Sequence, residues 1–484
     1  MKQINKLKTI ILAVFVSFTA CDTVDFGDTN IDPNNPSNPV PSLLLTNVQR
    51  GMSGYIASTT SNLYVQYLSN GQYDEESRYQ TLNWDTNGAY GLLEDIKSII
   101  TVNSDPETQE AARAYGSNGN QIAAATILRV WYFQMMTERW GYLPYSEANN
   151  VDFNNLAETS KPKYDSQEEI YMGLFAELDT ALSSIDSGSG PEGDILFGGD
   201  MTMWRSFANT IKMTMALRLS NADPTTGRTK FNEALSGGAI SSNANNLQYT
   251  YLSEDTNDNP WQDRFESRRD YLMSDVFVNA LIGTGTNTAP EDPRLPMMAE
   301  LSTNGAIYVG APYGQSNSAT DDYSFITDDI INKGDAPLMI YTYAEVLFAR
   351  AEAAAMGWTT ENAATLYGQA VTASMSQWGV SSTDAATYLA ANAYTNVNDI
   401  AYEKWVSLFL QGYNSWAEWR RFKAMGTESR IGLVAPPNLL SNANGIPQRH
   451  GYSATAASLN EANYNAAISA QGPDELDTIL WLFK

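Results

Sequence analysis

The chain has few residues that could carry out covalent catalysis. Its one histidine, His450, excludes a histidine pair for zinc and an HExxH helix. A Ser-His-Asp triad would need a G-x-S-x-G turn to present the serine, and the Gly51–Gly54 segment has the wrong spacing. His450 follows Gln448 and Arg449 in a polar loop, so we expect it to have a surface or capping role rather than a catalytic one.

Nucleotide and metal motifs are also missing. The Gly283–Gly285 segment begins a glycine-rich loop but lacks the third glycine and the preceding strand of a dinucleotide site, and no Walker A motif occurs. Two carboxylates would be enough for a glycoside hydrolase, and the acids at 74–76 and 321–322 are candidates. Adjacent acids are more often solvated loop charges. We therefore expect no catalysis, no cofactor and no metal, with a lipoprotein glycoside hydrolase as the alternative.

Aromatic residues in the loops indicate a different chemistry, the binding of sugars. A sugar has apolar C–H faces edged by hydroxyls, so its site combines aromatic rings with planar hydrogen-bonding side chains. Trp84 and Trp261 lie in polar loops with no obvious helical core to enter, and we expect them to converge on one exposed face. The expected ligand-binding residues are Trp84, Trp261, Tyr73, Tyr313, Asp85, Gln262 and Arg269, and the same loops also contain Tyr79, Tyr308 and Tyr323.

A competing interpretation applies to Trp261. Because this residue follows Pro260, it could instead pack the loop onto the helical body and only stabilise it. Five other tryptophans recur at helical spacing and are expected in the core: Trp131, Trp140, Trp204, Trp378 and Trp405.

Apolar residues three and four apart predict that helices position these loops. The predicted helices are Gln121–Trp140, Gln167–Ile185, Met201–Ser220, Tyr341–Met356, Glu361–Trp378 and Tyr402–Met425. Residues 344–356 and 361–378 should form a helical hairpin that resembles a tetratricopeptide unit, although no clean 34-residue period runs through the chain. The predicted fold is all-α, with tetratricopeptide-like helix pairs in a superhelical scaffold. Long irregular loops are expected at Ser69–Gly88, Asn243–Arg269, Gly283–Pro337 and Gly426–Thr455.

The N-terminus has the pattern of a lipoprotein export signal. Lys2, Lys6 and Lys8 precede a ten-residue, mostly apolar run that is too short to span a bilayer. Small residues then lead to Cys21, the only cysteine, which cannot form an internal disulfide. We expect a signal peptide at 1–20, lipidation of Cys21, a tether at 21–41 rich in Asp, Asn and Pro, and a single domain at 42–484.

The composition and the net charge limit the kinds of partner that the protein can bind. The 43% hydrophobic and 11% aromatic content is enough for a large core. The net charge is −26, and it becomes −29 once the three lysines of the signal are removed. Such acidity argues against binding to nucleic acid and against electrostatic adhesion to anionic lipid. The expected attachment to a membrane is therefore through the lipid anchor.

A series of short motifs resembles the SusD/RagB-type outer-membrane lipoproteins of Bacteroidetes. Each motif is weak alone, but their shared order along nearly the whole mature chain is specific. The motifs lie at Asn30–Asn34, Trp140–Ala148, Pro162–Glu168, Trp204–Asn209, Asn259–Trp261, Asp292–Pro296, Tyr343–Val346, Trp416–Arg421 and Asn460–Ala467.

The resemblance implies a cell-surface lipoprotein that binds nutrient without transforming it. It also implies a partner, a SusC-like TonB-dependent β-barrel transporter in the outer membrane, over which the lipoprotein would act as a hinged lid. Members of such a family take up glycans or peptides, so we expect a glycan and keep a peptide as the alternative. The shared motifs include Tyr145, Glu147, Arg420 and Arg421, which we expect to connect helices rather than to touch ligand.

Overall fold

The computed structural model describes residues 39–80, 84, 86–150, 155, 159–440 and 443–484. The predicted signal peptide, the lipidation site at Cys21, most of the tether and the predicted ligand residue Asp85 lie outside the described residues. Residues Pro41–Lys484 form one compact unit. Among the described residues, no helix has both the length and the apolar character needed to cross a membrane.

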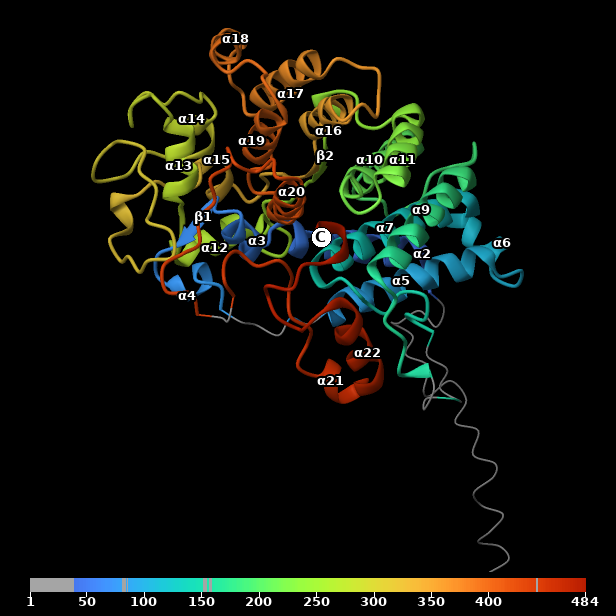
Figure 1. The fold of residues 1–484 in the computed structure, drawn as a ribbon. Coiled ribbons are helices and arrows are strands. Elements are labelled where there is room, and N and C mark those ends of the chain that lie inside the picture. The colour runs from blue at the N-terminus through green and yellow to red at the C-terminus, as the bar shows by residue number, and fades with distance from the viewer. Residues whose placement is uncertain (1–38, 81–83, 85, 151–154, 156–158, 441–442) are drawn as a thin grey trace, which may run out of the picture. The chain divides into compact units, whose positions relative to one another are not determined.

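The described part of the chain is mostly helical, as predicted (Figure 1). The helices of its first half are α2 (Pro41–Ile56), α3 (Thr59–Tyr64), α4 (Asp74–Ser77), α5 (Asn87–Ser104), α6 (Gln109–Ala112), α7 (Asn118–Trp140), α9 (Gln167–Ser184), α10 (Met201–Arg218) and α11 (Pro224–Gly237). Those of the second half are α12 (Pro260–Ser267), α13 (Asp275–Ile282), α14 (Leu295–Met298), α15 (Asp328–Ile331), α16 (Tyr343–Ala355), α17 (Ala363–Gln377), α18 (Ser382–Ala391), α19 (Val397–Ser407), α20 (Gly412–Met425), α21 (Ala456–Leu459) and α22 (Glu461–Gln471).

Strands and 3₁₀ turns make up a small share of the structure. Antiparallel pairing joins β1 (Leu68–Asn70) to β3 (Tyr271–Met273) and β2 (Leu247–Tyr249) to β4 (Leu338–Tyr341). The 3₁₀ turns are η2 (Arg113–Tyr115), η3 (Asn243–Asn245), η4 (Thr320–Asp322) and η5 (Trp481–Phe483).

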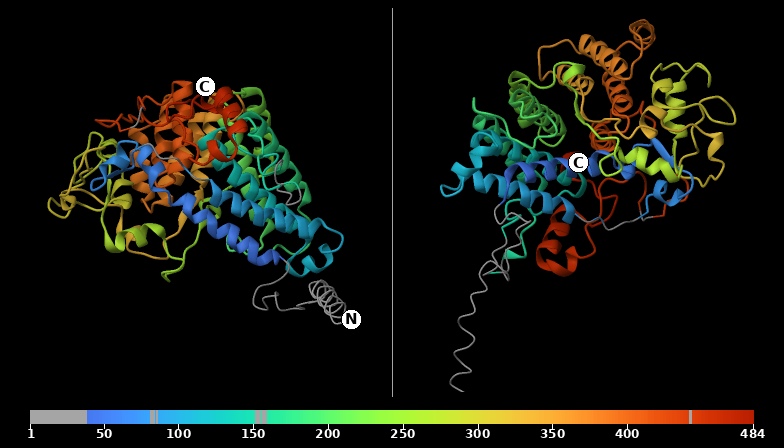
Figure 2. Two further views of the ribbon diagram at one scale, coloured as in Figure 1. Left: turned by 90° about the horizontal axis from the view of Figure 1, so that it is seen from below. Right: turned by 180° about the vertical axis from the view of Figure 1, so that it is seen from behind.

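Helices that follow one another in the sequence pack in pairs. Helix α7 packs on α5 and α9, α10 on α11, and α16 on α17, where the last pair is the predicted tetratricopeptide-like hairpin. Figure 2 shows this orange pair again from behind. Ala351 and Ala370 are fully buried in the cluster between α16 and α17 and allow a close approach of the two helices. At the start of α9, Ser166 and Glu169 form a reciprocal capping box.

One predicted helix is wrong in extent. Tyr402–Met425 is two helices, because the chain turns between Ser407 and Gly412, where Leu410 has a left-handed φ of 64°. The start of α20 packs closely on α3: a side chain at Gly412 would meet Ser61 Oγ at 2.4 Å. The apolar spacing continues through both helices, so the sequence pattern does not show the turn between them. The close packing of α20 on α3 stabilises this turn.

Two of the motif residues that we expected to connect helices, Arg420 and Arg421, do so, whereas Glu147 joins two loop segments by accepting from the Lys163 N–H at 2.8 Å. Arg420 donates to the carbonyl oxygens of Glu138 (2.7 Å) and Gln448 (2.9 Å), which lie on other segments. Arg421 forms ion pairs with Glu352 of α16 and Glu418 of its own helix. These arginines are buried and hold the helical body together.

Candidate functional site

The structure brings polar and aromatic side chains together where β1 pairs with β3. We call the surface formed by Tyr73, Arg268, Asp270, Asn317 and Tyr323 the hairpin surface, after the antiparallel β1–β3 pair, although these two strands lie far apart in the sequence. It lies within the described part of two predicted irregular loops and at the end of a third.

Local hydrogen bonds shape this surface. Asn70 ends β1, and its side-chain oxygen accepts from the backbone N–H of Gln72 (3.1 Å) and Tyr73 (2.8 Å). Gly71 donates to the Asp270 carbonyl (3.2 Å) and accepts from the Asn317 N–H (2.7 Å). A side chain at Gly71 would lie 2.8 Å from the Asn317 carbonyl oxygen, so glycine lets the three segments meet.

Tyr73 is the most exposed aromatic ring of the hairpin surface. It is 37% exposed, and the Arg268 guanidinium lies 4.7 Å from its centroid and donates to its hydroxyl. Asp270 pairs with Arg268 at 3.1 Å, and Asn317 donates to the Tyr323 hydroxyl at 2.6 Å. An aromatic face beside planar donors and acceptors suits the binding of a hydroxyl-rich ligand.

Two other predicted residues lie close in sequence but interact elsewhere. Gln262 donates to Glu266 at 2.7 Å along α12, and the Arg269 guanidinium lies 4.5 Å from the Phe325 ring. Sequence reasoning overlooked Arg268 and Asn317. The only sequence signal for Arg268 is its place in a charged run directly before a strand.

The expected exposure of Trp261 is wrong. Its side chain is 0% exposed, with the Tyr271 ring 6.2 Å away edge to face and the Arg264 guanidinium 5.0 Å from its ring. Asn259 caps α12 by accepting from the Trp261 N–H, and Pro260 occupies the first turn. The loop is thus a short helix whose inner face buries Trp261, as the competing interpretation held.

The expected exposure of Tyr313 is also wrong. Only 3% of Tyr313 is exposed, and its hydroxyl donates to the Leu63 carbonyl at 2.6 Å. The Tyr79 hydroxyl lies 3.3 Å away. Burial raises the pKa of Tyr313 well above its usual value, so this hydroxyl stays protonated as a structural donor.

Trp84 is half-buried and stacks on His450 rather than joining Tyr73. The two ring centroids are 4.5 Å apart with planes 19° from parallel, and Trp416 also stacks on His450 at 5.2 Å. The surface or capping role expected for His450 is wrong, because the residue is 0% exposed and its ring nitrogens have no hydrogen-bond partner among the described residues. Burial lowers the pKa of His450 well below its usual value, and the positive charges of Arg139 and other nearby arginines lower it further.

This buried histidine should make the protein less stable in acid. The folded protein keeps His450 neutral, whereas the unfolded chain takes up a proton below a pKa of about 6.5. The unfolded state therefore binds more protons, and the free energy of unfolding should fall by up to about 1.4 kcal/mol per pH unit below that value. The variant His450→Phe, which keeps an aromatic ring and loses no hydrogen bond, should lack this contribution in urea unfolding between pH 7 and 5.

The difference between the two proteins isolates the histidine. Burial raises the pKa of Glu345, which acts in the opposite direction over this range because the folded state then holds the extra proton. Glu345 is present in both proteins and cancels. An identical pH dependence in wild type and His450→Phe would contradict the prediction.

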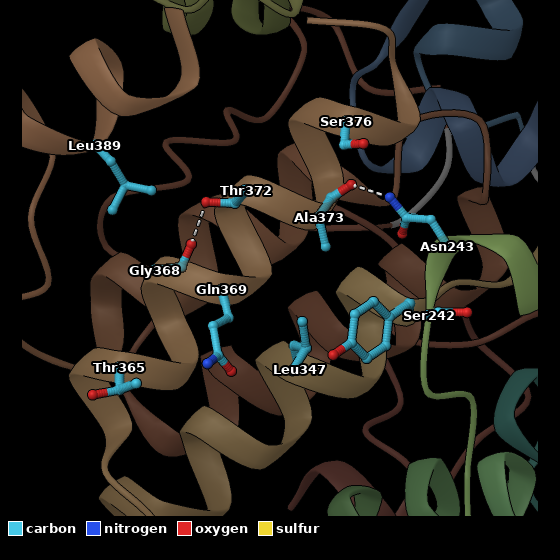
Figure 3. Close-up of a pocket in the computed structure, with 11 residues that line it drawn as sticks. Ser242, Asn243, Leu347, Thr365, Gly368, Gln369, Thr372, Ala373, Ser376 and Leu389 are labelled. Atoms are coloured by element: carbon cyan, nitrogen blue, oxygen red, sulfur yellow. Dashed lines mark hydrogen bonds between the residues drawn. The ribbon is translucent and has the colours of Figure 1, made fainter. Parts of the chain in front are cut away.

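Among the hollows in the described part of the chain, two lie away from the hairpin surface and are considered for binding. One, of about 610 Å³, lies between α5 and the C-terminal segment and is lined by Tyr90, Tyr164 and Tyr452. The other, of about 720 Å³, lies along α16 and α17 (Figure 3). In the described part of the chain, no group of three or more His, Cys, Asp or Glu side chains is arranged to hold a metal ion.

The structure is that of a mostly helical protein that presents long irregular loops. Residues 33–453 match the SusD-like family described as starch-binding and associating with the outer membrane, and the chain belongs to this family. It is a family of binding proteins rather than enzymes. No curated protein matches the sequence significantly.

Solved structures share the fold. A SusD homologue from Bacteroides fragilis is 20% identical, with a TM-score of 0.77 over 92% of this chain and 100% of the other. A chitin-binding protein is 23% identical, with a TM-score of 0.75 over 92% and 100%. A SusD-like protein from Bacteroides thetaiotaomicron is 22% identical, with a TM-score of 0.74 over 92% and 98%. At these identities the similarity shows the fold alone.

Proposed function

We propose that this protein captures a glycan at the cell surface through the hairpin surface and carries out no catalysis. The observation that carries the proposal is the exposed Tyr73 ring held by Arg268, with the Asn317–Tyr323 pair joined to the same end of β1 through the Gly71 backbone. The part of the Tyr73 ring that Arg268 leaves exposed can stack on a sugar face, while the amide, guanidinium and carboxylate groups bind hydroxyls. Family membership supports the same function.

The proposal includes the attachment and the partner of the protein. A signal peptide at 1–20 is removed, Cys21 is lipidated, residues 21–41 act as a tether, and residues 42–484 form the binding domain. The lipid holds the domain at the outer membrane, where it passes glycan to a SusC-like TonB-dependent transporter. The outer-membrane association in the family description and the export pattern before Cys21 support this arrangement.

Substituting Tyr73 tests the binding surface. Loss of a stacked aromatic anchor costs about 2 kcal/mol, so Tyr73→Ala should weaken glycan affinity roughly thirtyfold. Its melting temperature should stay unchanged, because the ring is already partly exposed. An array of oligosaccharides and peptides first identifies ligands of the wild type, and calorimetry then measures the affinity of each variant.

The matched control is Tyr115→Ala at the end of η2, a half-buried tyrosine whose side chain makes no hydrogen bond to the described residues. Its affinity should equal that of the wild type. Equal binding by Tyr73→Ala and wild type would refute the proposed surface. Binding of peptides alone would refute the ligand class, and release of shortened sugars would identify a glycoside hydrolase.

A further inference from the structure

A groove of about 720 Å³ follows the exposed side of the α16–α17 helix pair and shares no lining residue with the hairpin surface. Tyr343 and Leu347 of α16 are among the lining residues. Leu389 of α18 lies at one end of the groove and Asn243 of η3 at the other (Figure 3). The volume is in the range of small-molecule binding sites.

One face of α17 supplies hydrogen-bonding side chains along the whole groove. Thr365, Gln369, Thr372 and Ser376 are spaced by four, three and four residues, so they share a face about 16 Å long. Figure 3 shows them arrayed along the helix. Thr372 donates to the Gly368 carbonyl at 2.8 Å, which leaves its oxygen free to accept. The side chains of Thr365, Gln369 and Ser376 have no hydrogen-bond partner among the described residues.

The groove also contains a buried acceptor. The Asn243 amide nitrogen donates to the Ala373 carbonyl at 2.9 Å, but its side-chain oxygen is buried and has no partner among the described residues. The hydrogen-bonding groups that a ligand in the groove can reach are therefore mainly those of α17.

No Asp, Glu, Lys, Arg or His side chain lines this groove. Surface helices are commonly stabilised by ion pairs three or four residues apart, yet α17 contains no acidic or basic residue at all. In a chain of net charge −26, an uncharged exposed face is not explained by solubility. A charged ligand would find no counter-charge here, whereas a neutral, hydroxyl-rich one would find donors and acceptors beside apolar patches.

Protein docking fits the lining less well than a sugar does. The centres of protein interfaces are enriched in aromatic residues, methionine and arginine. Tyr343 is the one such residue that lines the groove, and small hydroxyl and amide side chains form the rest of its polar lining.

We propose that this groove is a second binding site, specific for a short neutral segment of glycan. The ligand class rests on the proposed function, but the residues are different. Two such sites would let one long glycan bind with greater avidity than either site provides alone.

The test removes the two sites separately. Thr372→Val combined with Gln369→Met removes a hydroxyl and an amide from an exposed helix face while it keeps their approximate size. Thr387→Val is the matched control, because Thr387 is an exposed threonine of α18 whose hydroxyl also bonds the carbonyl four residues earlier, at 2.9 Å. Each change is made in the full chain and in a Tyr73→Ala, Arg268→Ala background, and an array of neutral and uronic-acid oligosaccharides is probed.

With the hairpin surface removed, residual binding should be confined to neutral oligosaccharides. The groove variant should weaken that binding about tenfold, as expected for two lost hydrogen bonds, and Thr387→Val should not change it. If the hairpin variant alone abolishes all glycan binding, the groove proposal fails while the proposed function stands. The groove proposal also fails if the groove variant leaves the residual glycan binding intact. It fails too if the groove variant loses a co-purifying protein instead of glycan binding. If no oligosaccharide binds the wild type, both proposals fail.

Discussion

Replacement of Arg421 by alanine should lower the free energy of unfolding by about 3–5 kcal/mol, the usual cost of leaving buried charges without their partner. Arg421 is fully buried, and its two terminal nitrogens reach both oxygens of Glu352, at 2.5 and 2.7 Å. The same guanidinium contacts Glu418 at 2.5 Å. Its removal would leave Glu352 without a direct ion pair among the described residues and weaken the contacts of Glu418.

The effect should extend over several helices, because Glu418 also pairs with Arg218 of α10 and with Lys404 of α19. Urea unfolding followed by circular dichroism measures the change. Arg421→Met keeps most of the volume but not the charge, so it should be nearly as destabilising as alanine if charge is the cause.

An exposed arginine provides the control. Arg113 is 59% exposed at its side chain and pairs with Glu110 at 3.1 Å, so Arg113→Ala should cost no more than about 1 kcal/mol. Similar losses for Arg113→Ala and Arg421→Ala would show that the buried cluster has no special role in stability.

Trp261→Ala should destabilise the protein by about 3–5 kcal/mol and leave glycan affinity unchanged. The indole is fully buried against Tyr271 and Arg264, so its loss leaves a cavity beneath α12. Melting temperature and glycan affinity are measured on the same preparation. Trp261→Phe, which retains part of the packing, should lie between wild type and alanine in stability.

Comparison with Tyr73→Ala makes the two roles distinguishable. Tyr73→Ala should lower the glycan affinity without lowering the melting temperature. Trp261→Ala should lower the melting temperature without lowering the glycan affinity. Weaker glycan binding by Trp261→Ala with an unchanged melting temperature would indicate that Trp261 contacts the ligand, and it would contradict the structural role.

The sequence by itself determined the helical architecture, because helices depend on local patterns. Apolar residues three and four apart mark α7, α9, α10, α16 and α17 within a few residues of their observed ends. The capping box of α9 and the close α16–α17 hairpin follow from neighbouring residue types in the same way. The ordered series of short motifs was also sufficient to indicate the family.

Only the tertiary structure decided which loop aromatics are exposed, because exposure depends on partners that are distant in sequence. Tyr313 is buried and donates a hydrogen bond to Leu63, which lies 250 residues away in the sequence, and the Trp84 ring stacks on His450. Trp261 and Tyr73 are both aromatic residues in polar segments, yet one is buried under a capped helix and the other is exposed beside Arg268. Local composition is similar at both positions, and the difference comes from the elements that pack against them.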